Sequence, residues 1–205
     1  VNTQRVNMSS SLMADGRMDS LAAGLHALYR PDANAGWSAT GQWRVGVEDG
    51  RLNRQQSFGG YSANPSSTWT SHHMAAGMQA RYQWQLGDSG SIGPVLGLDY
   101  LHYKRPGITE SGSALTRLKL DAAKANSLQA SLGVALRHQW QPSAGKRLSS
   151  EFAVTWEQAL LGSTQSQYAA FAASPQLGFE SDYARVNRNA LALRAGLNYQ
   201  ASDRL

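Results

Sequence analysis

The chain has 205 residues, a formal net charge of +5 and no cysteine. No run of about 18 apolar residues is present, which excludes a membrane-spanning helix, and the lack of thiols excludes disulfides, thiolate metal sites and a cysteine nucleophile. Because Lys and Arg are scattered rather than clustered, the basic balance does not indicate a nucleic-acid partner. The chain opens without Met and without an apolar signal segment, so we expect a mature or excised fragment.

Period-two patterns recur along the whole chain. Side chains of a strand point alternately to its two faces, so a strict alternation of apolar and polar residues predicts a strand. The first pattern is weak and the others are strong. We predict strands at about 5–14, 20–30, 37–48, 71–85, 92–103, 126–140, 148–160 and 189–200.

The segment 126–140 shows this alternation most clearly. Its apolar face carries Leu128, Ala130, Leu132, Val134 and Leu136, and its polar face carries Ser127, Gln129, Ser131, Arg137 and Gln139. About ten such residues, tilted, cross a bilayer. The modest mean hydropathy of −0.43 does not oppose a membrane location, because half of each barrel strand is polar. The sequence therefore predicts an all-β fold, an antiparallel transmembrane β-barrel.

The connections between these strands alternate in length. Short, turn-rich connections occur at 31–36, 87–90 and 141–146, and long ones occur at 49–70, 104–118 and 161–188. Outer-membrane barrels have short periplasmic turns and long external loops. Aromatic residues also gather near the short turns, as a periplasmic girdle requires; they are Tyr29, Trp37, Tyr82, Trp84, Trp140 and Tyr199.

A soluble antiparallel barrel or sandwich is the alternative fold, with the apolar face turned inward. Three features favour the membrane. The polar faces are rich in Gln, Ser, Thr, Asn and Gly but poor in Lys and Glu; the strands are longer than the usual five or six residues; and the aromatic residues stand at the strand ends.

Several motifs from residue 93 onward resemble those of the autotransporter β-domain. They are Gly93-Pro94-Val95-Leu96-Gly97-Leu98-Asp99-Tyr100, then Gly107-Ile108-Thr109-Glu110-Ser111-Gly112, then Ser127-Leu128-Gln129-Ala130-Ser131-Leu132-Gly133. The stretch 171–179, followed by Arg188-Asn189-Ala190-Leu191, is similar to that family's next long loop and strand. The resemblance extends from about Trp69 to Leu205.

This resemblance implies that residues 1–205 are part of a translocator barrel. The family's barrel has about twelve strands, so it implies that early strands, a helix that plugs the pore and a final hairpin lie outside this fragment. The implied function is to anchor in the Gram-negative outer membrane and to help export an N-terminal passenger. The implied partners are outer-membrane lipid, the protein's own passenger polypeptide and the outer-membrane assembly machinery, and neither a cofactor nor a catalytic residue is expected.

Eight charged residues fall on the predicted polar faces: Arg44, Glu48, Arg81, Asp99, Arg137, Glu151, Glu157 and Arg194. In a barrel they point into the lumen, because Arg on the lipid face costs about 2–4 kcal/mol at the bilayer midplane. They either line a hydrophilic conduit that holds a plug or passes an unfolded polypeptide, or form structural ion pairs between strands. The two roles are compatible.

A second hypothesis is a complete small outer-membrane barrel that acts as an adhesin or enzyme through its long loops. Its rim candidates are His72, His73, Glu110 and Asp182. Adjacent strand residues face opposite ways, so His72 and His73 cannot share a metal ion, and no Gly-x-Ser-x-Gly elbow is present. A third possibility, a soluble lipocalin-like binder, requires the two faces to be inverted.

The barrel hypothesis fixes the direction of individual side chains. The interior set is Arg44, Gln79, Arg81, Gln129, Arg137 and Arg194, and the lipid-facing set is Val45, Met74, Met78, Leu132, Leu136 and Leu193.

Overall fold

The computed structural model describes residues 2–8, 13–31, 35–112, 115–143, 146–162, 164–185 and 188–200. The all-β prediction is confirmed, since every regular element in these ranges is a strand. Among the described residues, no helix is long and apolar enough to cross a membrane.

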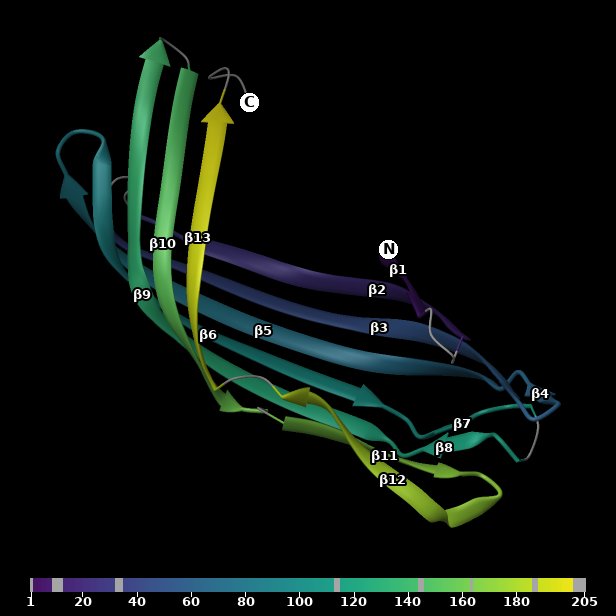
Figure 1. The fold of residues 1–205 in the computed structure, drawn as a ribbon. Coiled ribbons are helices and arrows are strands. Elements are labelled where there is room, and N and C mark those ends of the chain that lie inside the picture. The colour runs from purple at the N-terminus through teal and green to yellow at the C-terminus, as the bar shows by residue number, and fades with distance from the viewer. Residues whose placement is uncertain are drawn as a thin grey trace.

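The larger of two sheets in the described part of the chain is built from long strands, each antiparallel to its neighbours. Its order is β1-β2-β3-β5-β6-β9-β10-β13, and the short β4 (Tyr61–Ala63) pairs with β3 alone. The strands are β1 (Asn2–Met8), β2 (Met13–Tyr29), β3 (Gly36–Phe58), β5 (Ser66–Leu86), β6 (Gly90–Arg105), β9 (Ala123–Ser143), β10 (Lys146–Leu161) and β13 (Asn189–Gln200). This main sheet curls into an open half-barrel (Figure 1).

The two faces of this sheet differ in exposure. Several small side chains on the polar face are buried, among them Ser71, Val95 and Thr155, each 1% exposed. Large apolar side chains on the other face are open, such as Met78 at 61% and Leu132 at 52%. A curved sheet crowds its concave side and spreads its convex side, so the polar face is concave. This arrangement is the opposite of the one that a soluble barrel needs.

The apolar belt covers only part of the strand length. On β3 the outward side chains are apolar from Trp37 to Val47, whereas Asp49, Arg51 and Asn53 continue the same face. At about 3.3 Å per residue, the 23 residues of β3 far exceed the roughly ten needed to cross a bilayer. The strands therefore extend well beyond a hydrocarbon layer on the side of the long connections.

The long connections differ from the prediction, because they contain regular structure. β3 and β5 stay paired as far as Asn53↔Ser66, inside the connection predicted at 49–70. The connections at 104–118 and 161–188 hold parts of a second sheet of order β12-β11-β8-β7, made of β7 (Ile108–Thr109), β8 (Leu118–Leu120), β11 (Thr164–Phe171) and β12 (Ser174–Arg185). Figure 1 shows these strands and β4 gathered at one end of the main sheet.

The first predicted strand, at 5–14, is divided between β1 and β2, which pair from Asn2↔Ser20 to Met8↔Ala14. The turn at 87–90 lies where predicted, between β5 and β6. The predicted turns at 31–36 and 141–146 lie partly outside the described residues.

Aromatic rings pack together at the end of the sheet that carries the short turns. Trp37 and Tyr82 make an edge-to-face contact with ring centroids 5.1 Å apart, and Tyr82 and Trp84 make another at 5.3 Å. Trp37 and Trp84 remain more than half exposed. Exposed indole rings at the ends of strands are typical of the aromatic girdle at a membrane–water interface.

An interruption in the β5–β6 ladder explains the Gly93-Pro94 pair. The register runs to Arg81↔Val95 and resumes at Trp84↔Ile92. Pro94 has no backbone N–H, so a break in the ladder suits it. A Cβ on Gly93 would lie 1.7 Å from the carbonyl oxygen of Tyr82, so only glycine fits beside this break.

We therefore predict that Gly93→Ala destabilises the complete protein by about 1–3 kcal/mol, the usual cost of overpacking. Gly41→Ala is the matched control, because a Cβ at Gly41 meets nothing within 4 Å; its effect should stay within about 0.5 kcal/mol. Urea unfolding in detergent, followed by tryptophan fluorescence, measures both. Equal stability of the two variants would contradict the close backbone approach.

Candidate functional site: the polar face and the rim

The polar face brings together charges from strands that are not neighbours. Arg81 Nη1 on β5 lies 2.6 Å from Glu151 Oε1 on β10, and Arg137 Nη2 on β9 lies 2.8 Å from Glu151 Oε2. β6 and β9 lie between Arg81 and Glu151 in the sheet, so three strand spacings of about 4.8 Å separate their backbones on a flat sheet. Side chains converge over that span only on a concave face.

A second charged group lies further along the same face. Arg194 Nη2 on β13 is 3.0 Å from Glu157 Oε1, and Gln129 Nε2 donates to Glu157 Oε2 at 2.7 Å. These side chains and Asp99 border a hollow of about 400 Å³. Its other polar lining is supplied by the amides of Gln42 and Gln79 and by the side chains of His26, Thr40 and Ser131. The hollow can hydrogen-bond a peptide backbone, because amide side chains both donate and accept.

The remaining predicted residues lie toward the long connections. Glu48 Oε1 is 3.6 Å from His73 Nδ1, and Ser71 Oγ donates to Glu48 Oε2 at 3.3 Å. Arg44 and Asp99 border a second hollow of about 490 Å³. All eight predicted residues thus share one face. Those with a cross-strand partner at hydrogen-bond or ion-pair distance are Glu48, Arg81, Arg137, Glu151, Glu157 and Arg194.

The rim is the end of the molecule formed by β4, β7, β8, β11, β12 and the adjoining ends of β3 and β5. Two of its long connections are joined by strand pairing, from Ala169↔Leu120 to Phe171↔Leu118. The connection at 49–70 joins these two through Ser66, whose backbone exchanges hydrogen bonds of 3.3 and 2.8 Å with the backbone of Ser111. The three connections therefore form one continuous belt.

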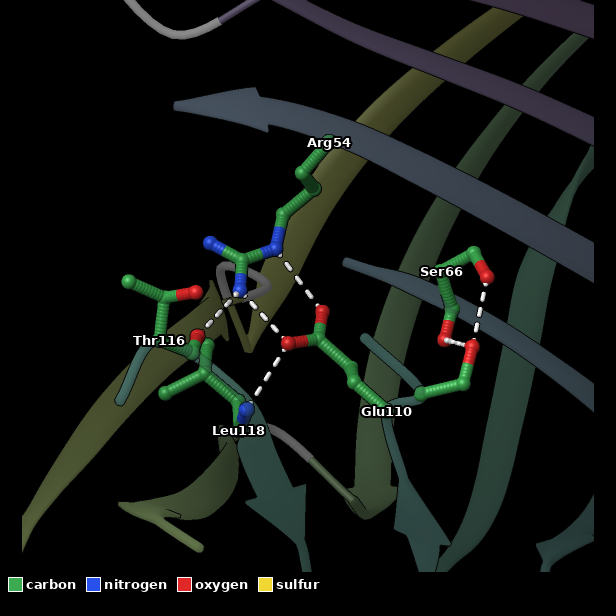
Figure 2. Close-up of polar contacts among 6 residues, drawn as sticks. Arg54, Ser66, Glu110, Thr116 and Leu118 are labelled. Carbon is green, nitrogen blue, oxygen red and sulfur yellow. Dashed lines mark hydrogen bonds and ion pairs between the residues drawn. The ribbon is translucent and has the colours of Figure 1, made fainter. Parts of the chain in front are cut away.

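A buried ion pair holds this belt to the end of β3 (Figure 2). Arg54 donates from Nε to Glu110 Oε1 at 2.8 Å and from Nη2 to Glu110 Oε2 at 2.6 Å. The backbone N–H of Leu118 donates to Glu110 Oε2 at 2.8 Å, and Arg54 Nη2 reaches the carbonyl of Thr116 at 3.4 Å. The Glu110 side chain is only 2% exposed. A bidentate arginine–carboxylate pair combines strength with fixed geometry.

The rim candidates of the adhesin or enzyme hypothesis do not converge. The side chain of His73 lies on the polar face near Glu48. The side chain of His72, whose ladder partner is Lys104, points to the opposite face. Glu110 is ion-paired with Arg54, and the side chain of Asp182 lies outside the described residues. Within the described part of the chain, no three His, Asp or Glu side chains form a group that could hold a metal ion.

Sequence reasoning found Glu110 through the loop motif but missed Arg54. Arg54 follows Asn53 in a stretch where both strand faces are polar, so no periodicity distinguishes it. The one available signal was a carboxylate in an otherwise uncharged loop motif, which needs a cationic partner if it is buried.

The geometry of the main sheet defines a class of protein. An antiparallel sheet that curls around a charged, hydrogen-bonding face and turns an apolar belt outward, with aromatic rings at one end, is the wall of an outer-membrane β-barrel. The family model described as the autotransporter beta-domain matches residues 2–205, and the chain belongs to that family. Its members are outer-membrane barrels of type V secretion, and the β-domain serves as a translocator rather than a catalyst. No curated protein sequence gave a significant match.

Glu110→Gln should open the rim without unfolding the wall. We expect the free energy of local opening around β7 and β8 to fall by about 3–5 kcal/mol, because removing one partner leaves Arg54 charged, largely buried and unpaired. Hydrogen exchange of the Glu110 and Leu118 amides in the complete protein measures this opening.

Arg17→Gln is the control, since Arg17 pairs with Asp19 on an exposed surface, with side chains 56% and 39% exposed. Such pairs contribute about 0–1 kcal/mol. Unchanged exchange at the backbone amides of residues 110 and 118 in the Glu110→Gln protein would show that the pair does not hold the rim.

Proposed function

We propose that this domain anchors an autotransporter in the Gram-negative outer membrane and provides the channel wall for export of its N-terminal passenger. The observation that carries the proposal is the concave polar face, whose eight charged residues and amide side chains would line a hydrated lumen. The apolar belt would meet lipid, and the rim would face the outside. Membership of the autotransporter β-domain family supports the same role.

Closure of the barrel is part of this proposal. In the described residues, β1 and β13 are the edge strands of the main sheet, and residues 21–29 of β2 have a partner on one side only. An unpaired strand edge in hydrocarbon costs several kcal/mol per backbone group. We therefore propose that further strands complete the wall and that the outer-membrane assembly machinery inserts the complete barrel.

The partners follow from the two faces. Lipid acyl chains would cover Leu132, Met78 and their neighbours, and the passenger polypeptide would pass or rest against the polar face. The adhesin or enzyme alternative receives no specific support, because Glu110 is held by Arg54 and His72 and His73 face apart.

Surface display of the passenger in the full-length protein tests the proposal. Leu132→Arg should abolish display, because it places a charge on the lipid face at a cost of about 2–4 kcal/mol. Gln129→Arg, on the polar face of the same strand, should keep display, since Glu157 is there to pair with it. An epitope on the passenger, probed by protease on intact cells, gives the readout. The proposal would fail if the passenger stayed displayed after deletion of residues 123–161. It would also fail if Leu132→Arg and Gln129→Arg gave the same level of display.

A further inference from the structure

Two guanidinium groups bind one carboxylate near the short-turn end of the polar face, and a third lies nearby. Arg81 and Arg137 each bind one oxygen of Glu151, at 2.6 and 2.8 Å. The side chains of this ion-paired trio are each less than one third exposed. Arg30, directly after β2, lies close enough to be repelled by Arg137 and Arg81 and attracted by Glu151.

The curl of the sheet creates this cluster. Arg30 follows the second strand of the sheet order and Glu151 lies on the seventh. The two nevertheless border the same hollow of about 520 Å³, together with Arg137. Strands from opposite halves of the sheet thus direct positive charge into one space.

The cluster carries more positive than negative charge. Glu151 is the carboxylate bound to its arginines, and Asp88 lines a separate small hollow together with Arg137. One carboxylate cannot neutralise three guanidinium groups, and the positive charges of Arg81 and Arg137, whose side chains are less than one quarter exposed, repel each other. An additional anion in the hollow would relieve this repulsion.

The lining of the hollow favours a carboxylate on a polypeptide. Ser149 and Asn198 add hydrogen-bonding side chains around the arginines. Arg194 borders both this hollow and the one beside Asp99, so the two are neighbours along the polar face. A guanidinium fork matches a carboxylate bidentately, while the amide side chains of the neighbouring hollow can hydrogen-bond an extended backbone lying alongside.

We propose that Arg30 and Arg137, which border the hollow, form with the neighbouring Arg81 a carboxylate-binding site whose ligand is an acidic side chain of a polypeptide segment lying against the polar face. The proposal rests on the proposed function, because it requires that face to be a lumen open to a polypeptide. It adds a specific contact: the segment is held at the short-turn end by an Asp or Glu.

Crosslinking in the full-length protein identifies the occupant. A photoreactive amino acid at Gln139, which borders the hollow beside Arg137, should capture a segment outside the barrel wall. Mass spectrometry should place an Asp or Glu within a few residues of the captured position. Capture of a wall strand, capture of a segment without an acid, or no capture at all would each overturn the proposal; the last is expected if only a small anion such as phosphate fills the hollow.

Charge variants test the contact itself. Arg30→Glu should lower the crosslink yield about tenfold or more, as expected for losing a charged hydrogen bond, and changing the captured acid to Arg in the same protein should restore it. Arg30 is suited to this test because it is exposed and Glu151 bonds to Arg81 and Arg137, so the wall keeps its own ion pairs. Arg17→Glu, toward the rim end of β2, is the control and should leave the yield unchanged.

The result separates this inference from the proposed function. Normal passenger display with a crosslink yield that is insensitive to Arg30→Glu, or a lost yield that charge reversal of the acid does not restore, would refute the carboxylate site alone. Absence of display in the wild-type protein would refute the export function instead.

Discussion

The curl of one antiparallel sheet toward its polar face determines the rest of the structure. Period-two alternation gives the sheet two chemically different faces, and curvature then crowds one and spreads the other. Because the polar side is the crowded one, Arg81 on β5 can reach Glu151 on β10 across two intervening strands. The same curvature leaves Leu132 and Met78 exposed on the outside. A sheet curled the other way would bury its apolar side chains, which would then form the core of a soluble barrel.

Much of the wall could be predicted from the sequence, because hydrocarbon on one side imposes a strong pattern. Seven of the predicted segments, from 20–30 onward, correspond to strands of the main sheet, and the interior set of side chains shares one face. The rim could not be predicted in the same way. Beyond Glu48 both faces of β3 meet a polar environment, so the alternation fades although the ladder continues. The β11–β12 hairpin was interpreted as a loop for the same reason.

The charged partners show where sequence reasoning stops. A strand pattern indicates the face on which Arg137 and Glu151 lie, and nearest-neighbour pairing is then easy to expect. Contacts between distant strands depend on curvature, which no local pattern encodes. Arg30 in a turn and Arg54 in a two-sided polar strand therefore emerge only from the three-dimensional arrangement, yet they belong to the two most distinctive polar clusters of the molecule.

The central claim is that the polar face meets water inside the barrel and the apolar face meets lipid. Single cysteine substitutions of Gln79, Gln129, Met78 and Leu132 in the full-length protein test it most directly, and the 205-residue chain adds no cysteine of its own. In outer-membrane vesicles, the account predicts that the thiols at positions 79 and 129 react with a water-soluble maleimide, whereas fluorophores at positions 78 and 132 are quenched by lipid-borne probes. Lipid quenching at positions 79 and 129, with positions 78 and 132 shielded from lipid inside a protein core, would contradict it.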